Sequence, residues 1–219
     1  YRDQPQQHVQ ELLNETLWPH QPLGRSIAGT EKTLDTIDRQ KLLGFLRQNY
    51  VTSSTLITAA GNLQHQQVVQ AVSKSARQLR VGKRVTFSPA VENQTAPRLR
   101  QFTKNTEQAQ IALGIRGCSR HDERRYALRL LNTVLGENMS SRLFQTVREK
   151  HGLAYSIFSS TSCFNDTGDL VISAGLDTDK LEKALKLICL ELKQLCEKVI
   201  SPGELRRAEW SEIDLDGAT

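Results

Sequence analysis

The clearest structural signal in the chain is Leu135-Gly-Glu-Asn-Met-Ser-Ser-Arg-Leu-Phe-Gln-Thr-Val-Arg-Glu-Lys-His-Gly-Leu-Ala-Tyr-Ser156. Ser140 or Ser141 can open a short helix that ends near Lys150. Gly152 then permits a turn, and a strand is predicted from Ala154 to Ser162. This stretch therefore predicts a helix, a turn and a strand in close succession.

The residues on either side extend this pattern. A strand over Gln110–Ile115 and a helix over Asp122–Leu135 come before it, and a second strand over Asp169–Ala174 follows the turn Phe164–Gly168. Strands joined by so tight a turn pair antiparallel. The longest helix begins near Asp177, and Ser201-Pro202 opens a last one. The apolar stripe of the longest helix steps by four and three residues: Leu181, Leu185, Ile188, Leu192, Leu195 and Val199.

The first part of the chain is mainly helical by its pattern. Helices are predicted over Pro5–Leu17, from a cap at Thr36 or Asp38 to Asn49, and over Gln64–Leu79. The short apolar run Leu56–Ala60, ended by Gly61-Asn62, indicates a buried strand. The whole chain is thus predicted to be α+β, with helices layered on a mainly antiparallel sheet.

Charge is concentrated in one stretch. The net charge of the 219 residues is +5. Residues 77–104 hold seven basic residues and one acid, so the rest of the chain is nearly neutral. Such a stretch can bind nucleic acid, but it has few aromatic residues and no zinc-finger or helix-turn-helix pattern. We interpret it as a solvated basic linker and expect no nucleic-acid partner.

The residues that could hold a metal are scattered. The fragment His8-Val-Gln-Glu11 is followed by Leu12, where an inverted zinc motif needs histidine. No other histidine pairs with a second ligand, and the four cysteines form no C-x-x-C pair. We therefore expect buried free thiols and no metal site in this chain. Phosphate-binding loops, dinucleotide-binding glycine motifs and a G-x-S-x-G nucleophile motif are also missing.

Three segments carry a resemblance to a known family. The S-R-L-F and R-E-K-x-G-L-A-Y patterns of residues 141–155 resemble the second homologous domain of the insulinase/pitrilysin zinc peptidases, in the branch that includes the mitochondrial processing peptidases. Gln21–Thr30 is similar to the P-L-G-R-x-I-x-G-T segment of that family's first domain. Tyr50–Asn62 is similar to a later segment of the same domain that ends in A-A-G-N. The resemblance covers residues 1 to about 208.

The resemblance implies two homologous half-domains, both truncated. Residues 1–80 would be the C-terminal part of the first peptidase-like domain, residues 81–106 a basic interdomain linker, and residues 107–219 the N-terminal part of the second. The family's zinc ligands would all precede Tyr1. The resemblance thus implies zinc in the intact parent protein and none in this chain.

The resemblance also carries two site residues onto this sequence. The family's second domain contributes an arginine and a tyrosine, seven residues apart, to the catalytic chamber, and these match Arg148 and Tyr155. A tyrosine hydroxyl can donate to the oxyanion of peptide hydrolysis. An arginine fork can hold a substrate carbonyl. Taken without the resemblance, the two are an ordinary helix-surface charge and a half-buried strand residue.

Two functions follow as expectations. In the first, the chain is part of a zinc endopeptidase that hydrolyses peptides or unfolded polypeptides between two clamshell halves, and is inactive alone. In the second, it belongs to a non-catalytic partner subunit that supplies its second-domain surface to a zinc-bearing chain. A nucleic-acid-binding module is a third reading, which rests on the basic stretch alone. We expect a homo- or heterodimer with a homologous subunit. No apolar run approaches the roughly 20 residues that span a bilayer, so we expect a soluble protein. The resemblance favours a bacterial protein of the cytoplasm or periplasm, and the sequence does not define the compartment.

Overall fold

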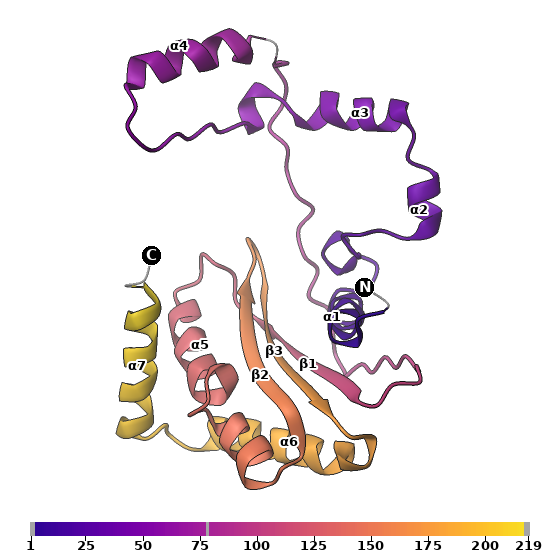
Figure 1. The fold of residues 1–219 in the computed structure, drawn as a ribbon, viewed down its shortest axis with the longest axis vertical. Coiled ribbons are helices and arrows are strands. Elements are labelled where there is room, and N and C mark those ends of the chain that lie inside the picture. The colour runs from indigo at the N-terminus through magenta and orange to yellow at the C-terminus, as the bar shows by residue number, and fades with distance from the viewer. Residues whose placement is uncertain (1–2, 78, 217–219) are drawn as a thin grey trace. The chain divides into compact units, whose positions relative to one another are not determined.

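The computed structural model describes residues 3–77 and 79–216 (Figure 1). The chain divides into two compact units. The first combines Tyr1–Arg25 with Ala90–Thr219, and the second is Ser26–Pro89. These units divide the chain at points other than the predicted domain ranges 1–80, 81–106 and 107–219, which concern homology to a peptidase and stay a prediction.

A three-stranded antiparallel sheet is the centre of the first unit. The strands are β1 (Ala109–Gly117), β2 (Ala154–Cys163) and β3 (Gly168–Leu176), in the order β1-β3-β2. Every residue of β3 is buried. A strand buried on both faces needs cover on both sides of the sheet, so β3 is flanked by strands and covered by helices. The three strands and the α+β class predicted from sequence are confirmed.

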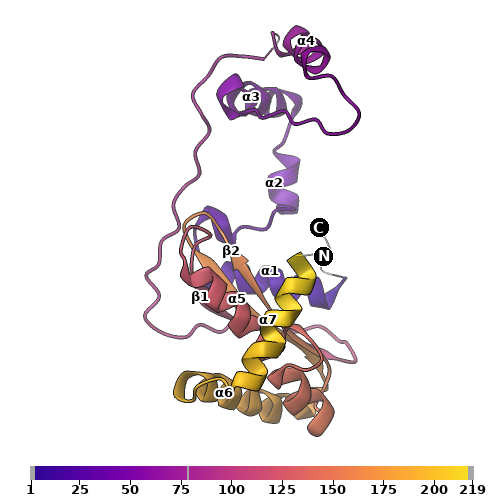
Figure 2. The same cartoon turned by 90° about the vertical axis from the view of Figure 1, so that its left-hand side faces the viewer.

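One face of the sheet packs against the helices that follow in the chain (Figure 2). These are α5 (Arg124–Asn132), α6 (Leu181–Glu197) and two π-helical segments, η3 (Thr133–Glu137) and η4 (Phe144–Lys150). The core on this face draws heavily on residues 135–154 and on α6. Its most buried members are Leu135, Leu143, Val147, Ile172, Leu176, Ala184 and Ile188.

The opposite face is covered by α1 (Pro5–Leu17), which packs Leu13, Leu17 and the adjoining Trp18 against Val171 of β3. Gly114 of β1 makes this close approach possible, because a Cβ atom there would lie 2.7 Å from a methyl carbon of Leu17. The helix that the sequence predicts over residues 5–17 therefore packs on the same sheet as residues 109–176.

Two further parts of the first unit are a helix at its C-terminal end and a segment without regular secondary structure. The helix α7 (Pro202–Asp216) begins after Ser201, whose hydroxyl accepts from the Glu204 N–H at 3.3 Å, as the predicted cap requires. Residues 90–106 form no helix or strand and belong to the first unit. There the Val91 N–H donates to Gln21 Oε1 at 2.7 Å, and Phe102 meets the His8 ring edge-on at 4.6 Å.

The second unit is helical. It contains α2 (Glu31–Asp35), α3 (Arg39–Asn49) and α4 (His65–Ala76), and a longer segment with the 3₁₀ turn η2 (Thr52–Ser54) connects α3 to α4. Asp38 caps α3 as predicted, since its Oδ1 accepts from the Lys41 N–H at 2.7 Å. The helix predicted over Gln64–Leu79 is confirmed up to Ala76, and residue 78 lies outside the described residues.

Two sequence predictions are wrong. No strand forms over Leu56–Ala60, and Leu56 is 88% exposed. Within the described residues of this unit, the one β-type contact is an isolated bridge between Val51 and Arg80, so the apolar run has no partner strand to satisfy its backbone groups. Cys189 and Cys196 are exposed free thiols on α6 rather than buried ones, because each follows a core-facing position of the helix by one residue.

Candidate functional site

The candidate site lies where η4 turns into β2. Arg148 is in the last turn of η4, and Tyr155 is the second residue of β2. Between them Gly152 has a φ of +57°, a left-handed conformation that favours glycine. The Gly152 N–H donates to the Arg148 carbonyl and the Leu153 N–H to that of Val147, each at 3.0 Å. These bonds close the helix end and fix the spacing of the two candidate residues.

A β-bulge sets the direction of Tyr155. Ala154 pairs with Leu176 and Ser156 with Gly175, so Tyr155 is left without a partner in the ladder. The extra residue lets Ala154 and Ile157 both reach the core, while Tyr155 points outward and is 56% exposed. Bulges commonly re-aim a side chain in this way. Tyr155 is therefore a presented residue and not a core residue.

The hydroxyl of Tyr155 already has a partner. It donates to Asp177, at 3.0 Å from Oδ1 and 3.2 Å from Oδ2. The ammonium of Lys180 donates to Asp177 Oδ2 at 2.7 Å and lies 5.9 Å from the centroid of the Tyr155 ring. The hydrogen bond to the Asp177 carboxylate raises the pKa of Tyr155, and the Lys180 ammonium together with the Tyr155 hydroxyl lowers the pKa of Asp177.

Arg148 is held more loosely. Its guanidinium carbon lies 4.8 Å from the centroid of the Phe144 ring, and its Nε is 3.8 Å from Glu149 Oε1. Its side chain is 44% exposed. Among the described residues no hydrogen bond or ion pair joins Arg148 to Tyr155. The two predicted site residues are thus both accessible, on adjoining elements, without direct contact.

Sequence reasoning missed the partners of Tyr155 at this site and one ion pair outside it. Asp177 and Lys180 gave no motif and are recognised only through their contacts with Tyr155. The pairing of Arg142 with Glu204, across 62 positions of the chain, was not foreseen. The guanidinium of Arg142 makes two hydrogen bonds with the Glu204 carboxylate, at 2.8 and 3.1 Å, and these lower the pKa of Glu204 to about 2.

A separate hollow of about 470 Å³ lies between η3 and α7. Its lining includes Asn138, Glu204, Arg207 and Trp210, but neither Arg148 nor Tyr155. The hollow is therefore distinct from the predicted site.

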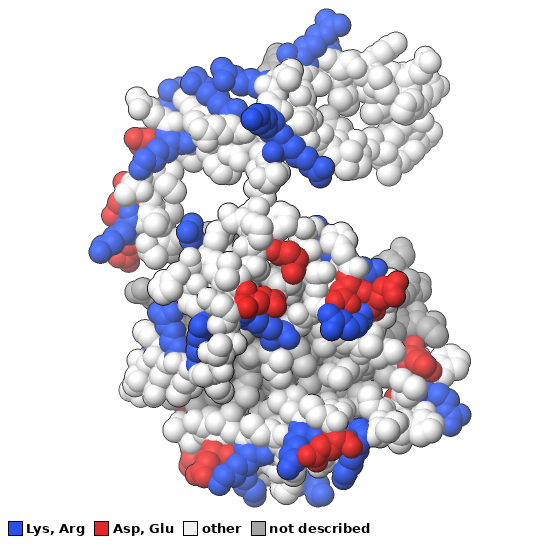
Figure 3. Space-filling view, turned by 180° about the vertical axis from the view of Figure 1, so that it is seen from behind, with Lys and Arg blue, Asp and Glu red and all other residues white. Residues whose placement is uncertain are grey.

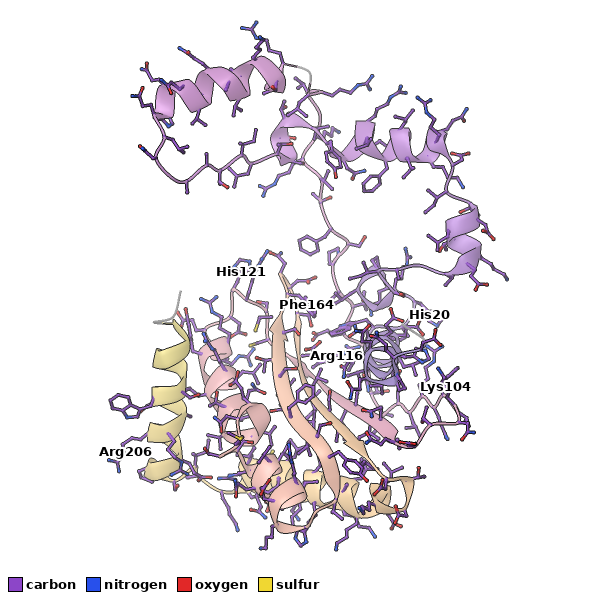
Figure 4. All side chains as sticks on the ribbon, in the orientation of Figure 1. His20, Lys104, Arg116, His121, Phe164 and Arg206 are labelled. Atoms are coloured by element: carbon purple, nitrogen blue, oxygen red, sulfur yellow. The ribbon has the colours of Figure 1, made fainter. Side chains whose placement is uncertain are left out.

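The described residues do not fit a zinc site. Within residues 3–77 and 79–216, no group of three His, Cys, Asp or Glu side chains is placed to hold a metal ion. His8 instead packs against Phe102, and His121 shares Asn165 with Arg120 through contacts of 3.2 and 2.7 Å near the Phe164 turn (Figure 4). No step of a reaction is therefore assigned to a metal held by this part of the chain.

The basic stretch is divided between the two units. Its first four cations, from Arg77 to Arg84, lie in the second unit and the remaining three in the first. Of these three, Arg100 pairs with Glu15, and Lys104 lies 3.4 Å from Asp3. On the face of the first unit that Figure 3 shows, basic and acidic residues are interspersed. This arrangement favours a solvated surface over one continuous basic stripe.

Comparison with known proteins identifies the family. The sequence pattern of the family described as the peptidase M16 inactive domain matches residues 36–211. The chain belongs to that family. This confirms the insulinase-type resemblance of the sequence, whereas the branch that includes the mitochondrial processing peptidases stays a prediction. The matched range runs continuously through the predicted linker.

Bacterial relatives share the family. A Streptomyces coelicolor protein named an uncharacterized zinc protease is 36% identical over 212 residues, which are 94% of this chain and 46% of that protein. The uncharacterized zinc protease YmxG of Bacillus subtilis is 34% identical over 209 residues, covering 95% of this chain and 50% of that protein. The chain thus spans about half the length of the curated relatives it matches.

Solved structures share the fold. The peptidase M16 inactive domain from Pseudomonas fluorescens has a TM-score of 0.84 at 21% identity, covering all of this chain and 52% of that one. A protease from Helicobacter pylori has a TM-score of 0.82 at 18% identity, covering 99% of this chain and 54% of that one. Among the residues that the structure describes, no helix is long and apolar enough to cross a membrane.

Proposed function

We propose that the chain is a segment of a zinc-dependent endopeptidase and supplies Arg148 and Tyr155 to a chamber in which peptides or unfolded polypeptides are cleaved. The observation that carries the proposal is the presentation of both side chains by one helix–turn–strand unit. In this view residues 1–80 and 107–219 are parts of two homologous halves that close on the substrate, and zinc belongs to another part of the parent protein. The chain alone is then inactive.

The chemistry suits the two residue types. Hydrolysis of a peptide bond passes through a tetrahedral oxyanion, and a positioned O–H donor stabilises that charge more than it stabilises the ground state. Tyr155 would be such a donor. The planar guanidinium of Arg148, with its several N–H groups, would hold a substrate carbonyl beside it.

A second candidate is a non-catalytic partner subunit that offers the same surface to a zinc-bearing homologue. Both candidates predict no three-ligand group in this segment, so the description of the matching family as an inactive domain is what motivates the second one. The two candidates differ in whether the parent protein has the inverted zinc motif H-x-x-E-H. Reading the rest of the parent sequence, and measuring its zinc content, would separate them. A homologous subunit is the proposed partner in either case.

Substitution of Tyr155 tests the donor role in the intact parent enzyme. Tyr155→Phe removes only the hydroxyl, and loss of one such donor typically lowers kcat by about 10²–10³. Arg148→Ala should weaken substrate binding and lower the rate together. Both are measured by steady-state hydrolysis of a quenched fluorescent peptide, with zinc content and circular dichroism followed in parallel.

Tyr126→Phe is the matched control, because Tyr126 is also exposed, at 60%, but lies in α5. It should leave kcat unchanged. Near-full kcat for Tyr155→Phe would rule out the oxyanion role and leave Tyr155 as a surface residue of β2.

A further inference from the structure

Asp177 is placed to act on Tyr155 by the pairing of two strand ends. Ala154, the first residue of β2, pairs with Leu176, the last residue of β3, so Tyr155 and Asp177 both lie at this end of the sheet. The bulge after Ala154 turns the tyrosine outward, and its hydroxyl meets the Asp177 carboxylate at 3.0 Å. Leu176 is fully buried, which anchors the backbone on the Asp177 side.

The Asp177 carboxylate is used unusually for its position. Asp177 precedes the 3₁₀ turn η5 (Thr178–Lys180), where an aspartate side chain ordinarily accepts from a backbone N–H of the turn. It makes no such bond. Its two oxygens accept instead from the Tyr155 hydroxyl and the Lys180 ammonium. The carboxylate therefore orients a side chain and does not cap a turn.

We infer that Asp177, backed by Lys180, is the positioning residue for Tyr155 and holds its hydroxyl at the exposed end of β2. An exposed tyrosine without a partner samples several rotamers, and a donor must be in place before the oxyanion forms. Lys180 neutralises the carboxylate and ties it back to its own turn. The catalytic consequence rests on the proposed function, whereas the hydrogen bond that positions Tyr155 is a property of this chain.

The phenol of Tyr155 has one proton, so its hydroxyl can donate to Asp177 or to an oxyanion but not fully to both. While Tyr155 donates to Asp177, its oxygen can only accept. An oxyanion that forms in a closed, water-poor site is a stronger hydrogen-bond acceptor than the carboxylate of the partly exposed Asp177. The Tyr155 hydroxyl can therefore redirect its hydrogen bond from Asp177 to the oxyanion when it forms. Asp177 thus contributes placement before the reaction, and its loss should lower kcat while leaving KM nearly unchanged.

The ionisation of Tyr155 tests the hold without any activity. The charged groups that face its hydroxyl are Asp177, Asp179 and Lys180. Asp177→Asn should lower the pKa of Tyr155, because it removes a negative acceptor, whereas Lys180→Met should raise it, because it removes a nearby positive charge. Alkaline difference absorbance of the phenolate, at micromolar protein, measures both, and the Tyr155→Phe chain supplies the baseline.

Lys186→Met is the control, since Lys186 pairs with Glu182 on the exposed side of α6 and should not move the titration of Tyr155. A structural defect would not shift the titration in opposite directions for the two test variants. If the pKa of Tyr155 stayed unchanged in both Asp177→Asn and Lys180→Met, or shifted in the same direction in both, Asp177 would not be its positioning residue.

A double-mutant cycle in the intact parent enzyme tests the catalytic consequence. We expect Asp177→Asn to lower kcat by about tenfold, and to have no further effect when combined with Tyr155→Phe, because a residue that acts through another is silent once that residue is gone. A full tenfold loss in the Tyr155→Phe background would show that Asp177 acts elsewhere. If Tyr155→Phe itself kept full activity, the proposed role of Tyr155 would fail, and the titration would still decide whether the hold exists.

Discussion

Arg142 and Glu204 join two segments that lie 62 residues apart in the chain. Their side chains are only 17% and 24% exposed, and two parallel hydrogen bonds connect them. Removing one partner of a pair with little solvent access costs more than breaking an exposed pair, because the remaining charge is left without its partner. At the scale of single residues, this pair links the Ser141–Phe144 segment to α7.

Glu204→Gln should lower the free energy of unfolding at pH 7. The carboxyl pKa falls from 4.5 to about 2 on folding, and this shift corresponds to about 1–3 kcal/mol after allowance for partial exposure. Because the folded pKa is the lower one, the contribution is present above pH 4.5 and is lost as the pH falls towards 2. Urea melts at pH 7 and pH 3 measure it.

The comparison variant for this prediction is Glu182→Gln, in which an exposed i,i+4 pair with Lys186 is lost. It should change stability little. Equal losses for the two variants, or a loss for Glu204→Gln that is undiminished at low pH, would contradict the assignment.

At the scale of elements, three irregularities occur within or at the edge of residues 135–156. They are the π-helical segments η3 and η4 and the bulge of β2. Regular elements place side chains at fixed periods, so each irregularity changes which residues face the core. Leu143, just before η4, and Val147 within it are fully buried, while Arg148 stays at the surface. The irregular geometry is what lets one stretch supply both core and candidate site.

Gly152→Ala should destabilise this junction. The residue has a φ of +57°, and a Cβ atom in that conformation costs about 1 kcal/mol although nothing lies within 4 Å of it. Chemical denaturation measures the change. Gly203→Ala, in the first turn of α7, is the control and should be neutral or slightly stabilising, since its φ is not positive. Equal stability of Gly152→Ala and the unaltered chain would remove the backbone argument.

At the scale of the whole chain, the two units differ in how they bury apolar surface. The first has two apolar clusters, one on each face of its sheet. In the second, Val51 is the one buried apolar side chain among the described residues, whereas Leu42, Phe45 and Leu56 are all more than half exposed. Apolar surface of this kind invites association.

The isolated chain should retain far less than one equivalent of zinc after dialysis. A catalytic zinc site requires three protein ligands, and the described residues bring no such group together. Elemental analysis of the dialysed chain is the measurement, and the intact parent protein is the comparison. One tightly held zinc per isolated chain would show that ligands come together in a way that this structure does not contain.

Local pattern was enough for most of the elements. These elements depend on apolar period and on hydrogen bonds within a few residues. They include the helix over residues 5–17, the Asp38 and Ser201 caps, the three strands and the long helix after Asp177. Arg148 and Tyr155 could be named as candidates only through the family resemblance. Their residue types alone fitted an ordinary surface charge and strand residue equally well.

Contacts between distant residues account for the rest. Leu56–Ala60 has the composition of a strand but forms none, because a strand needs a partner that local sequence does not supply. The bulge at Tyr155, its bond to Asp177 and the packing of α1 on β1 and β3 depend on register between segments far apart in the chain. Local sequence therefore specified the elements and their order, and tertiary packing selected which side chains meet, since a contact depends on two backbones and a helix or strand pattern on one.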